Sequence, residues 1–273
     1  MQRTAALSTA ALLALGTIAC GDPSSGGADR AGEPRSLNAL EAAAQAVDDA
    51  GTSRMDMRMK TEIGNHVFTL KTDGVFDYEN ETGEGSMTMA APDIMADLPG
   101  LSGRTKMVFH GGFLYLKGPI ATAYGASATG WGRLDTGEMG AEATQINQDP
   151  SQYLDFLRSA GAEVDEAGTE NVGGVRTTHY TGEIAFEDLA ARTDDFKELE
   201  AIGGKVAPIG LEAWIDDEGL PRRMSFAMEI DGVSGIPEGR MTVRATIDLF
   251  DYGVGVDVSP PKNFEDIAPL PAG

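Results

Sequence analysis

The stretch Arg54-Met55-Asp56-Met57-Arg58-Met59-Lys60 alternates charged residues with methionines without a break. Successive side chains of a β-strand point to opposite faces, so this pattern predicts a strand with methionines on one face and charges on the other. Such a strand is stable where its apolar face is covered and its charged face meets water, as in many antiparallel sheets. The stretch therefore predicts a half-buried strand of an antiparallel sheet.

The same two-residue period returns along most of the chain. It is clearest in residues 224–230 and 241–249, where apolar residues alternate without error. Gly111-Gly112 separates two further alternating runs and predicts a tight hairpin turn. The alternating positions that we expect to face inward are Met55, Met57, Met59, Phe68, Leu70, Met87, Met89, Met107, Phe109, Met224, Phe226, Met228, Met241 and Val243.

Helices are predicted at few places. Ser36 is a candidate N-cap for a helix whose apolar residues recur at helical spacing until Gly51. Asp149-Pro150 predicts a second helix, because Asp caps helices well and Pro fits the first helical position. The acidic segment 187–200 has apolar residues at roughly helical spacing and predicts a third.

The remaining segments predict connections and ends. Residues 118–130 have the composition of a loop, and the Pro-rich stretch 259–273 is expected to be extended and loosely held. Composition does not break within 36–267, which predicts a single domain followed by a loose tail at 268–273. We expect the α+β class: a large curved antiparallel sheet, or half-barrel, with a few helices on its concave apolar face.

The N-terminal segment has the features of an export signal. Arg3 precedes a short apolar run, and a small residue stands before Cys20, the only cysteine of the chain. The run is shorter than the about 20 apolar residues that span a bilayer. Thr17-Ile18-Ala19-Cys20 resembles the bacterial lipobox, whose cysteine is acylated after cleavage; an ordinary signal with an incidental cysteine is the alternative. We therefore expect a signal peptide at 1–19 and a lipidated Cys20 with a flexible tether at 20–35.

Composition narrows the possible partners. The chain has 21 basic and 43 acidic residues, for a formal net charge of −22. Nucleic acid is a poor partner for such a protein, because phosphate binding needs clustered Lys and Arg. The charge also repels anionic lipid headgroups, so attachment to the membrane is expected to depend on acyl chains. The oligomeric state is not predicted.

Three candidate reactive sites have plainer explanations. His110-Gly111-Gly112 is similar to the oxyanion stretch of esterases, but the chain has no Gly-x-Ser-x-Gly nucleophile elbow. The three histidines, including His179, show no clustering with cysteine and no His-Glu-x-x-His spacing for zinc. Asp216-Asp217-Glu218-Gly219 lacks the alternating oxygen ligands of an EF-hand loop and predicts a turn. We expect no catalytic residue, no metal site, no cofactor and no enzymatic activity.

The methionines allow two interpretations. Methionine has a low preference for strands, but its flexible thioether adapts to irregular apolar shapes. The inward-facing positions given above could therefore line a hydrophobic cavity for acyl chains. Alternatively, the chain's own helices fill the sheet core and methionine fills the gaps. Apolar residues on a breaker-rich segment could form a portal or lid, or an ordinary loop on the core: Ile94, Met95, Leu98 and Leu101.

Several segments between Ser36 and Ile267 resemble one family in their order and spacing. With the lipobox, they are Trp131-Gly132-Arg133-Leu134-Asp135, Asp149-Pro150 with Leu154-Asp155-Phe156-Leu157, Gly174-Val175-Arg176-Thr177-Thr178-His179-Tyr180, Trp214-Ile215-Asp216 and Gly219-Leu220-Pro221-Arg222-Arg223. Together they resemble the mycobacterial LppX/LprA/LprF/LprG lipoprotein family, whose fold is similar to that of the LolA and LolB carriers. The resemblance implies a half-barrel sheet that encloses a cavity for lipid acyl chains.

The first functional hypothesis is a non-enzymatic lipoprotein that binds, and in one form of the hypothesis transports, lipids. It would lie on the extracytoplasmic face of the cell membrane, which the resemblance also implies. The alternative is a LolA-like module with a filled core that senses or scaffolds other envelope proteins. A hydrolase is disfavoured, because no nucleophile stands beside a base in a recognisable motif.

Overall fold

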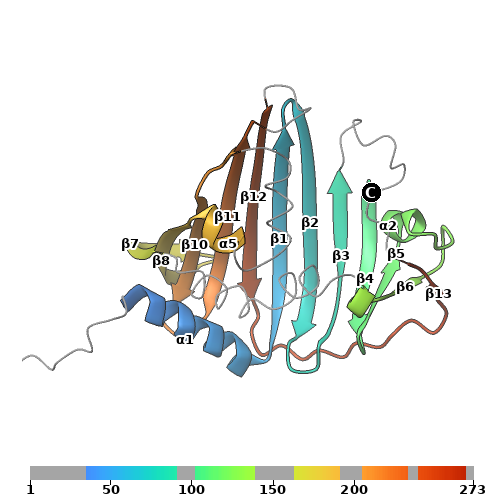
Figure 1. The fold of residues 1–273 in the computed structure, drawn as a ribbon. Coiled ribbons are helices and arrows are strands. Elements are labelled where there is room, and N and C mark those ends of the chain that lie inside the picture. Colours follow the sequence, from blue (N-terminus) through green and yellow to red (C-terminus); the bar gives the residue numbers. More distant parts are fainter. Residues whose placement is uncertain (1–34, 91–101, 139–162, 191–204, 233–238, 269–273) are drawn as a thin grey trace, which may run out of the picture. The chain divides into compact units, whose positions relative to one another are not determined.

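The alternating methionine stretch forms most of β1 (Thr52–Ile63), which lies in the middle of a large sheet (Figure 1). The computed structural model describes residues 35–90, 102–138, 163–190, 205–232 and 239–268. Strand β1 pairs with β2 (His66–Asp77) on one side and with β12 (Arg240–Phe250) on the other, both antiparallel. The chain thus brings β12, the last of its long strands, against its first strand.

The sheet is open and curved, and it runs in the order β13-β6-β5-β4-β3-β2-β1-β12-β11-β10-β8-β7, with β9 paired to β11. All neighbouring pairs are antiparallel except β13 with β6. The predicted α+β class with a large curved antiparallel sheet is confirmed. The other strands are β3 (Thr82–Ala90), β4 (Gly103–His110), β5 (Phe113–Lys117), β6 (Gly132–Asp135), β7 (Glu163–Val172), β8 (Val175–Ile184), β9 (Lys205–Val206), β10 (Ile209–Asp216), β11 (Pro221–Asp231) and β13 (Glu265–Asp266).

The predicted hairpin at Gly111-Gly112 joins β4 to β5. Both glycines have positive φ angles, of 62° and 77°, which side chains strongly disfavour. Two residues of positive φ give a turn whose twist matches that of the flanking strands. The pair of glycines therefore sets the register of this hairpin.

Helices occupy little of the described chain. Helix α1 (Arg35–Ala50) begins just before the predicted cap at Ser36, α2 is Pro119–Ala123, α5 is Phe186–Ala190, and a 3-10 turn spans Thr136–Glu138. In Figure 1, α1 and α2 lie near opposite ends of the sheet. No helix in the described ranges is long and apolar enough to cross a membrane.

Two elements differ from the expectations for loops and ends. The expected loop at 118–130 contains α2, because Pro119 stands at a first helical turn and Ile120 packs into the core. The stretch 259–273 is not loosely held at its centre, since β13 pairs with β6. The guanidinium of Arg133 lies 4.5 Å from the ring centre of Phe113 and 4.4 Å from that of Phe264, which fixes this segment further.

Strand β7 was not predicted. Four of its ten residues are acidic and most of its described residues are exposed. Among those described only Val164 and Val172 are buried, so apolar alternation is missing. It forms an edge strand of the sheet and has a neighbouring strand on one side only. Charged residues are tolerated on such an exposed edge. The predicted helix start at Asp149-Pro150 and most of segment 187–200 lie outside the described residues.

Candidate functional site

The strand register gathers the predicted inward-facing residues on one face of the sheet. Residues directly opposite each other on paired strands share a face, and side chains alternate along each strand. Met59, for example, lies opposite Leu70 of β2 and Ala245 of β12, and Leu70 lies opposite Met89 of β3. These pairings place on this surface, the methionine face, Met55, Met57, Met59, Phe68, Leu70, Met87, Met89, Met107, Phe109, Met224, Phe226, Met228, Met241 and Val243.

Helix α1 covers one part of the methionine face. Its residues Leu40, Ala43 and Ala44 are buried in a cluster with Met55 and Met224. The cluster also receives partly buried aromatic and methionine side chains, namely Phe109, Phe226 and Met228. In this part of the sheet, the chain's own helix fills the core, as the second of the two interpretations of the methionines expects.

A second cluster surrounds the short helix α2. Ile120 and Ala121 of the helix are buried with Met107 of β4 and Leu116 of β5. Met87, Met89 and Phe109 pack against this cluster from the same face of the sheet. Both helices therefore cover parts of the methionine face in the described structure.

A further strip of apolar residues lies on the neighbouring strands β2, β1 and β12. These residues share the methionine face but belong to neither of the clusters that the described residues form. Met57, Leu70 and Val243 are buried, and the others are half-buried. This central strip consists of Met57, Met59, Phe68, Leu70, Met241 and Val243.

Thr72 is a polar residue within the methionine face and is not among the predicted inward-facing positions. It lies opposite Met57 of β1 and Met87 of β3, with only 6% of its surface exposed. Its hydroxyl has no hydrogen-bond partner. The sequence did carry a signal, because Thr72 interrupts the alternating apolar run of residues 66–76 at an inward position.

The opposite face of the sheet is polar. A groove of about 610 Å³ lies there, lined partly by charged residues of the central strands and by the C-terminal segment at Ser259 and Pro261. It mixes cations with carboxylates, so it does not suit an alkyl chain. The charged residues lining it are Arg54, Asp56, Asp73, Glu84, Arg104 and Lys106.

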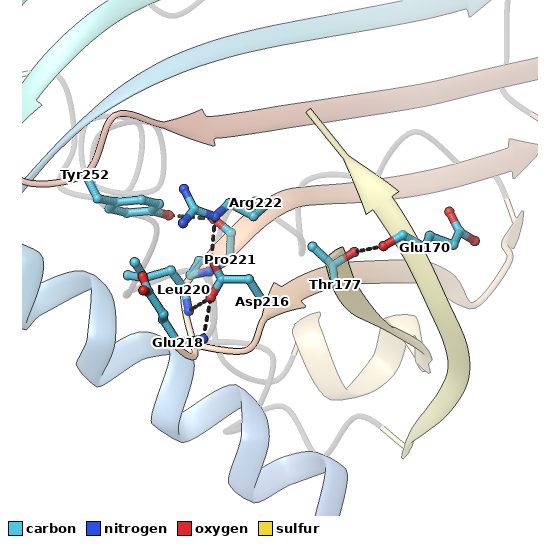
Figure 2. Close-up of polar contacts among 8 residues, drawn as sticks. All are labelled: Glu170, Thr177, Asp216, Glu218, Leu220, Pro221, Arg222 and Tyr252. Atoms are coloured by element: carbon cyan, nitrogen blue, oxygen red, sulfur yellow. Dashed lines mark hydrogen bonds and ion pairs between the residues drawn. The ribbon is translucent and has the colours of Figure 1, made fainter. Parts of the chain in front are cut away.

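The acidic turn after β10 is held by hydrogen bonds, as Figure 2 shows. The carboxylate of Asp216 accepts the backbone N–H groups of Glu218 and Leu220, each at 2.9 Å, and the Nε–H of Arg222 at 2.6 Å. The hydroxyl of Tyr252 donates to the carbonyl of Pro221 at 2.6 Å, and burial raises the pKa of this phenol. The oxygens that could have bound a cation are therefore used to close the turn.

His179 joins three neighbouring strands on the polar face. Its Nδ1 lies 3.3 Å from a carboxylate oxygen of Glu170 and its Nε2 lies 2.8 Å from one of Glu212. The imidazole stacks on the indole of Trp214, with ring centres 4.3 Å apart. These contacts link β7, β8 and β10. Within the described ranges, no group of three or more His, Cys, Asp or Glu could hold a metal ion.

Two of the predicted sites lie outside the described residues. They are the lipidation site Cys20 and the portal or lid residues, Ile94, Met95, Leu98 and Leu101. The segment that carries the portal residues connects β3 to β4, both of which contribute to the methionine face. Both sites stay predictions.

Comparisons with known proteins bear on the fold. No family model and no curated protein sequence matches the chain. The crystal structure of lipoprotein LppX from Mycobacterium tuberculosis is similar, with a TM-score of 0.53 and 14% identity over 84% of this chain and 100% of that one. LprF from Mycobacterium bovis has a TM-score of 0.48 and 15% identity, over 84% of this chain and 98% of that one.

A third similar structure is the MucA/MucB complex of Pseudomonas aeruginosa, with a TM-score of 0.35 and 14% identity over 84% of this chain and 59% of that one. Of these three similarities, the one to LppX is close enough to compare architectures. The large open curved antiparallel sheet and the few helices agree with it. The chain therefore has the fold of the LppX lipoprotein, as the sequence resemblance predicted.

Proposed function

We propose that this chain is a lipid-anchored protein of the bacterial cell envelope that binds acyl chains of lipids on the methionine face. The central strip carries the proposal, because its apolar side chains belong to neither helix-covered cluster of the described residues. An alkyl chain lying along β1 and β2 would cover these side chains with apolar contacts.

The energetics of such binding need no headgroup recognition. Each buried methylene contributes about 0.8 kcal/mol, so a long acyl chain is held by its length alone. Methionines such as Met57 and Met59 can adapt to kinks and to different chain lengths, because their side chains are unbranched and flexible. The proposed ligand class is therefore defined by its acyl chains.

The anchor and the entry route are part of the same proposal. Cys20 would carry the acyl groups that hold the protein on the extracytoplasmic face of the membrane, and durable anchoring takes more than one chain. The segment with Ile94, Met95, Leu98 and Leu101 would form the portal, since it joins two strands of the methionine face. A carrier or binding role without catalysis follows.

A second candidate is a protein–protein module on the same fold. The observation that favours it is that α1 and α2 already cover Met55 and Met107, two of the positions predicted to line a cavity. If the central strip is likewise covered by the chain itself, the protein would use its surfaces to contact other envelope proteins. The two candidates differ in whether lipid is present.

Native mass spectrometry of the full chain, purified from membranes in detergent, separates the candidates. We expect a mass adduct that leaves on collisional activation, whereas the acyl groups on Cys20 stay covalently attached. Extraction and mass spectrometry of the released molecule would identify it. A chain that carries no adduct and takes up no added diacyl lipid would contradict lipid binding and favour the protein–protein module.

A further inference from the structure

A lateral row of residues crosses the methionine face at the level of Thr72. Reading along the strand pairings, Met224 of β11 lies opposite Ile247 of β12, which lies opposite Met57 of β1. Thr72 of β2 follows, and then Met87 of β3. Thr72 thus places a hydroxyl between two thioether side chains at the edge of the central strip.

A second buried threonine in the same row shows what a satisfied hydroxyl does here. Thr105 of β4 lies opposite Met87 and is fully buried, and its hydroxyl accepts the backbone N–H of Ile120 at 3.2 Å. The Thr105 hydroxyl therefore anchors the start of α2 on the sheet. Thr72 makes no such contact.

An unpartnered buried hydroxyl is unfavourable, since it has left water without gaining a replacement hydrogen bond. Valine has nearly the same shape and is likewise enriched in strands, so packing alone does not explain a threonine at this position. A partner that arrives with a ligand would satisfy the hydroxyl. The side chains beside it are apolar, so the partner must come from a group within the acyl region of that ligand.

We propose that Thr72 is a polar subsite that donates a hydrogen bond to the ester or amide carbonyl of an acyl lipid. This inference rests on the proposed function and narrows the ligand class to acyl lipids with a carbonyl at the head of the chain. The chain itself would run along the central strip, beside Met57, Met59 and Leu70. Plain hydrocarbons would leave the hydroxyl unpaired, and ether lipids lack the carbonyl that the subsite is proposed to bind.

Two probes test the subsite in the full chain purified in detergent: dipalmitoylglycerol and its ether analogue dihexadecylglycerol, which lacks the ester carbonyls. Competition between them is measured by native mass spectrometry. Wild-type protein is expected to prefer the ester by about fivefold, the factor that one net hydrogen bond contributes. Thr72→Val should bind both probes equally.

A matched control is Thr88→Val. Thr88 lies on the adjacent strand β3 but on the opposite face, and it is exposed, so this variant should keep the preference for the ester. Lipid-free Thr72→Val should unfold at a temperature equal to or above that of the wild type, because the variant removes an unsatisfied group.

The outcomes distinguish the subsite from the proposed function. Binding of both probes with no preference in the wild type, or a preference that Thr72→Val keeps, would overturn the subsite and leave lipid binding intact. A lower unfolding temperature for Thr72→Val would show a structural partner for the hydroxyl and would also overturn it. Failure of the wild type to bind either probe would overturn the proposed function itself.

Discussion

The carboxylate of Asp216 lies 2.6 Å from Nε of Arg222 in the turn that joins β10 to β11 (Figure 2). The two side chains are 2% and 18% exposed, so the ion pair is largely shielded from water. The same carboxylate also accepts two backbone N–H groups of the turn. One acidic residue thus fixes the geometry between two strands that carry part of the methionine face.

Asp216→Asn is expected to destabilise the protein by about 3 kcal/mol, because it leaves the Arg222 guanidinium without its buried counter-ion. The free energy of unfolding in urea measures this effect. Asp217→Asn is the control, since Asp217 is the next residue and is exposed. A loss of similar size in both variants would show that turn charge in general, rather than the buried pair, determines stability.

Tyr252 predicts a dependence of stability on alkaline pH. Burial raises the pKa of its phenol in the folded state, whereas in the unfolded chain the phenol ionises near pH 10. Above about pH 10 the phenol ionises in the unfolded chain but stays neutral in the folded protein, so the free energy of unfolding decreases as the pH rises. Below that pH the phenol is neutral in both states and does not reduce the free energy of unfolding.

Tyr252→Phe should be less stable than the wild type at neutral pH by about 1 kcal/mol, because the hydrogen bond to the Pro221 carbonyl is lost. The difference should narrow between about pH 10 and 11, where only the wild type loses stability through this phenol. Urea unfolding at several pH values measures both. Tyr124→Phe serves as the control. If the difference in free energy of unfolding between Tyr252→Phe and the wild type did not change with pH, the result would contradict the argument.

Met59→Gln is expected to weaken retention of acyl lipid by roughly tenfold, since it places an amide against the alkyl chain. Met59→Leu should retain lipid, because it keeps an apolar side chain of similar volume. Lipid recovered per protein molecule after detergent washing measures the effect. Val67→Gln changes an exposed residue on the opposite face of β2 and should leave the lipid content unaltered. Equal losses in the two glutamine variants would refute binding at the central strip.

Cys20→Ser tests the anchor. Without the thiol no acyl chain can be attached, so we expect the protein to move from the membrane fraction to the soluble fraction on cell fractionation. The strong negative charge of the chain gives it no affinity for anionic headgroups that could replace the anchor. Ser24→Ala, in the adjacent tether, should stay in the membrane fraction. Persistence of the Cys20→Ser variant there would rule out lipidation as the means of attachment.

The alternation of apolar and polar residues predicted the strands well where one face of the sheet is buried and the other is exposed to water. The alternation around Met57 and through residues 224–230 and 241–249 determines strand, face and pairing parity, because the period of two is a property of each strand alone. The elements that were missed have weak local signals. Strand β7 is acidic at an exposed edge, and β13 is held by contacts of its neighbour Phe264 with Arg133, which is distant in the sequence.

The sequence by itself determined that the methionines share one face of an antiparallel sheet, because side-chain direction along a strand needs only the order of residues. Tertiary structure alone decided which parts of that face α1 and α2 cover and which form the central strip, since helix docking depends on contacts between distant segments. It alone also showed that the Thr105 hydroxyl has a partner and the Thr72 hydroxyl has none. Both threonines look alike in the sequence, and only the packing around each decides whether its hydrogen bond is made.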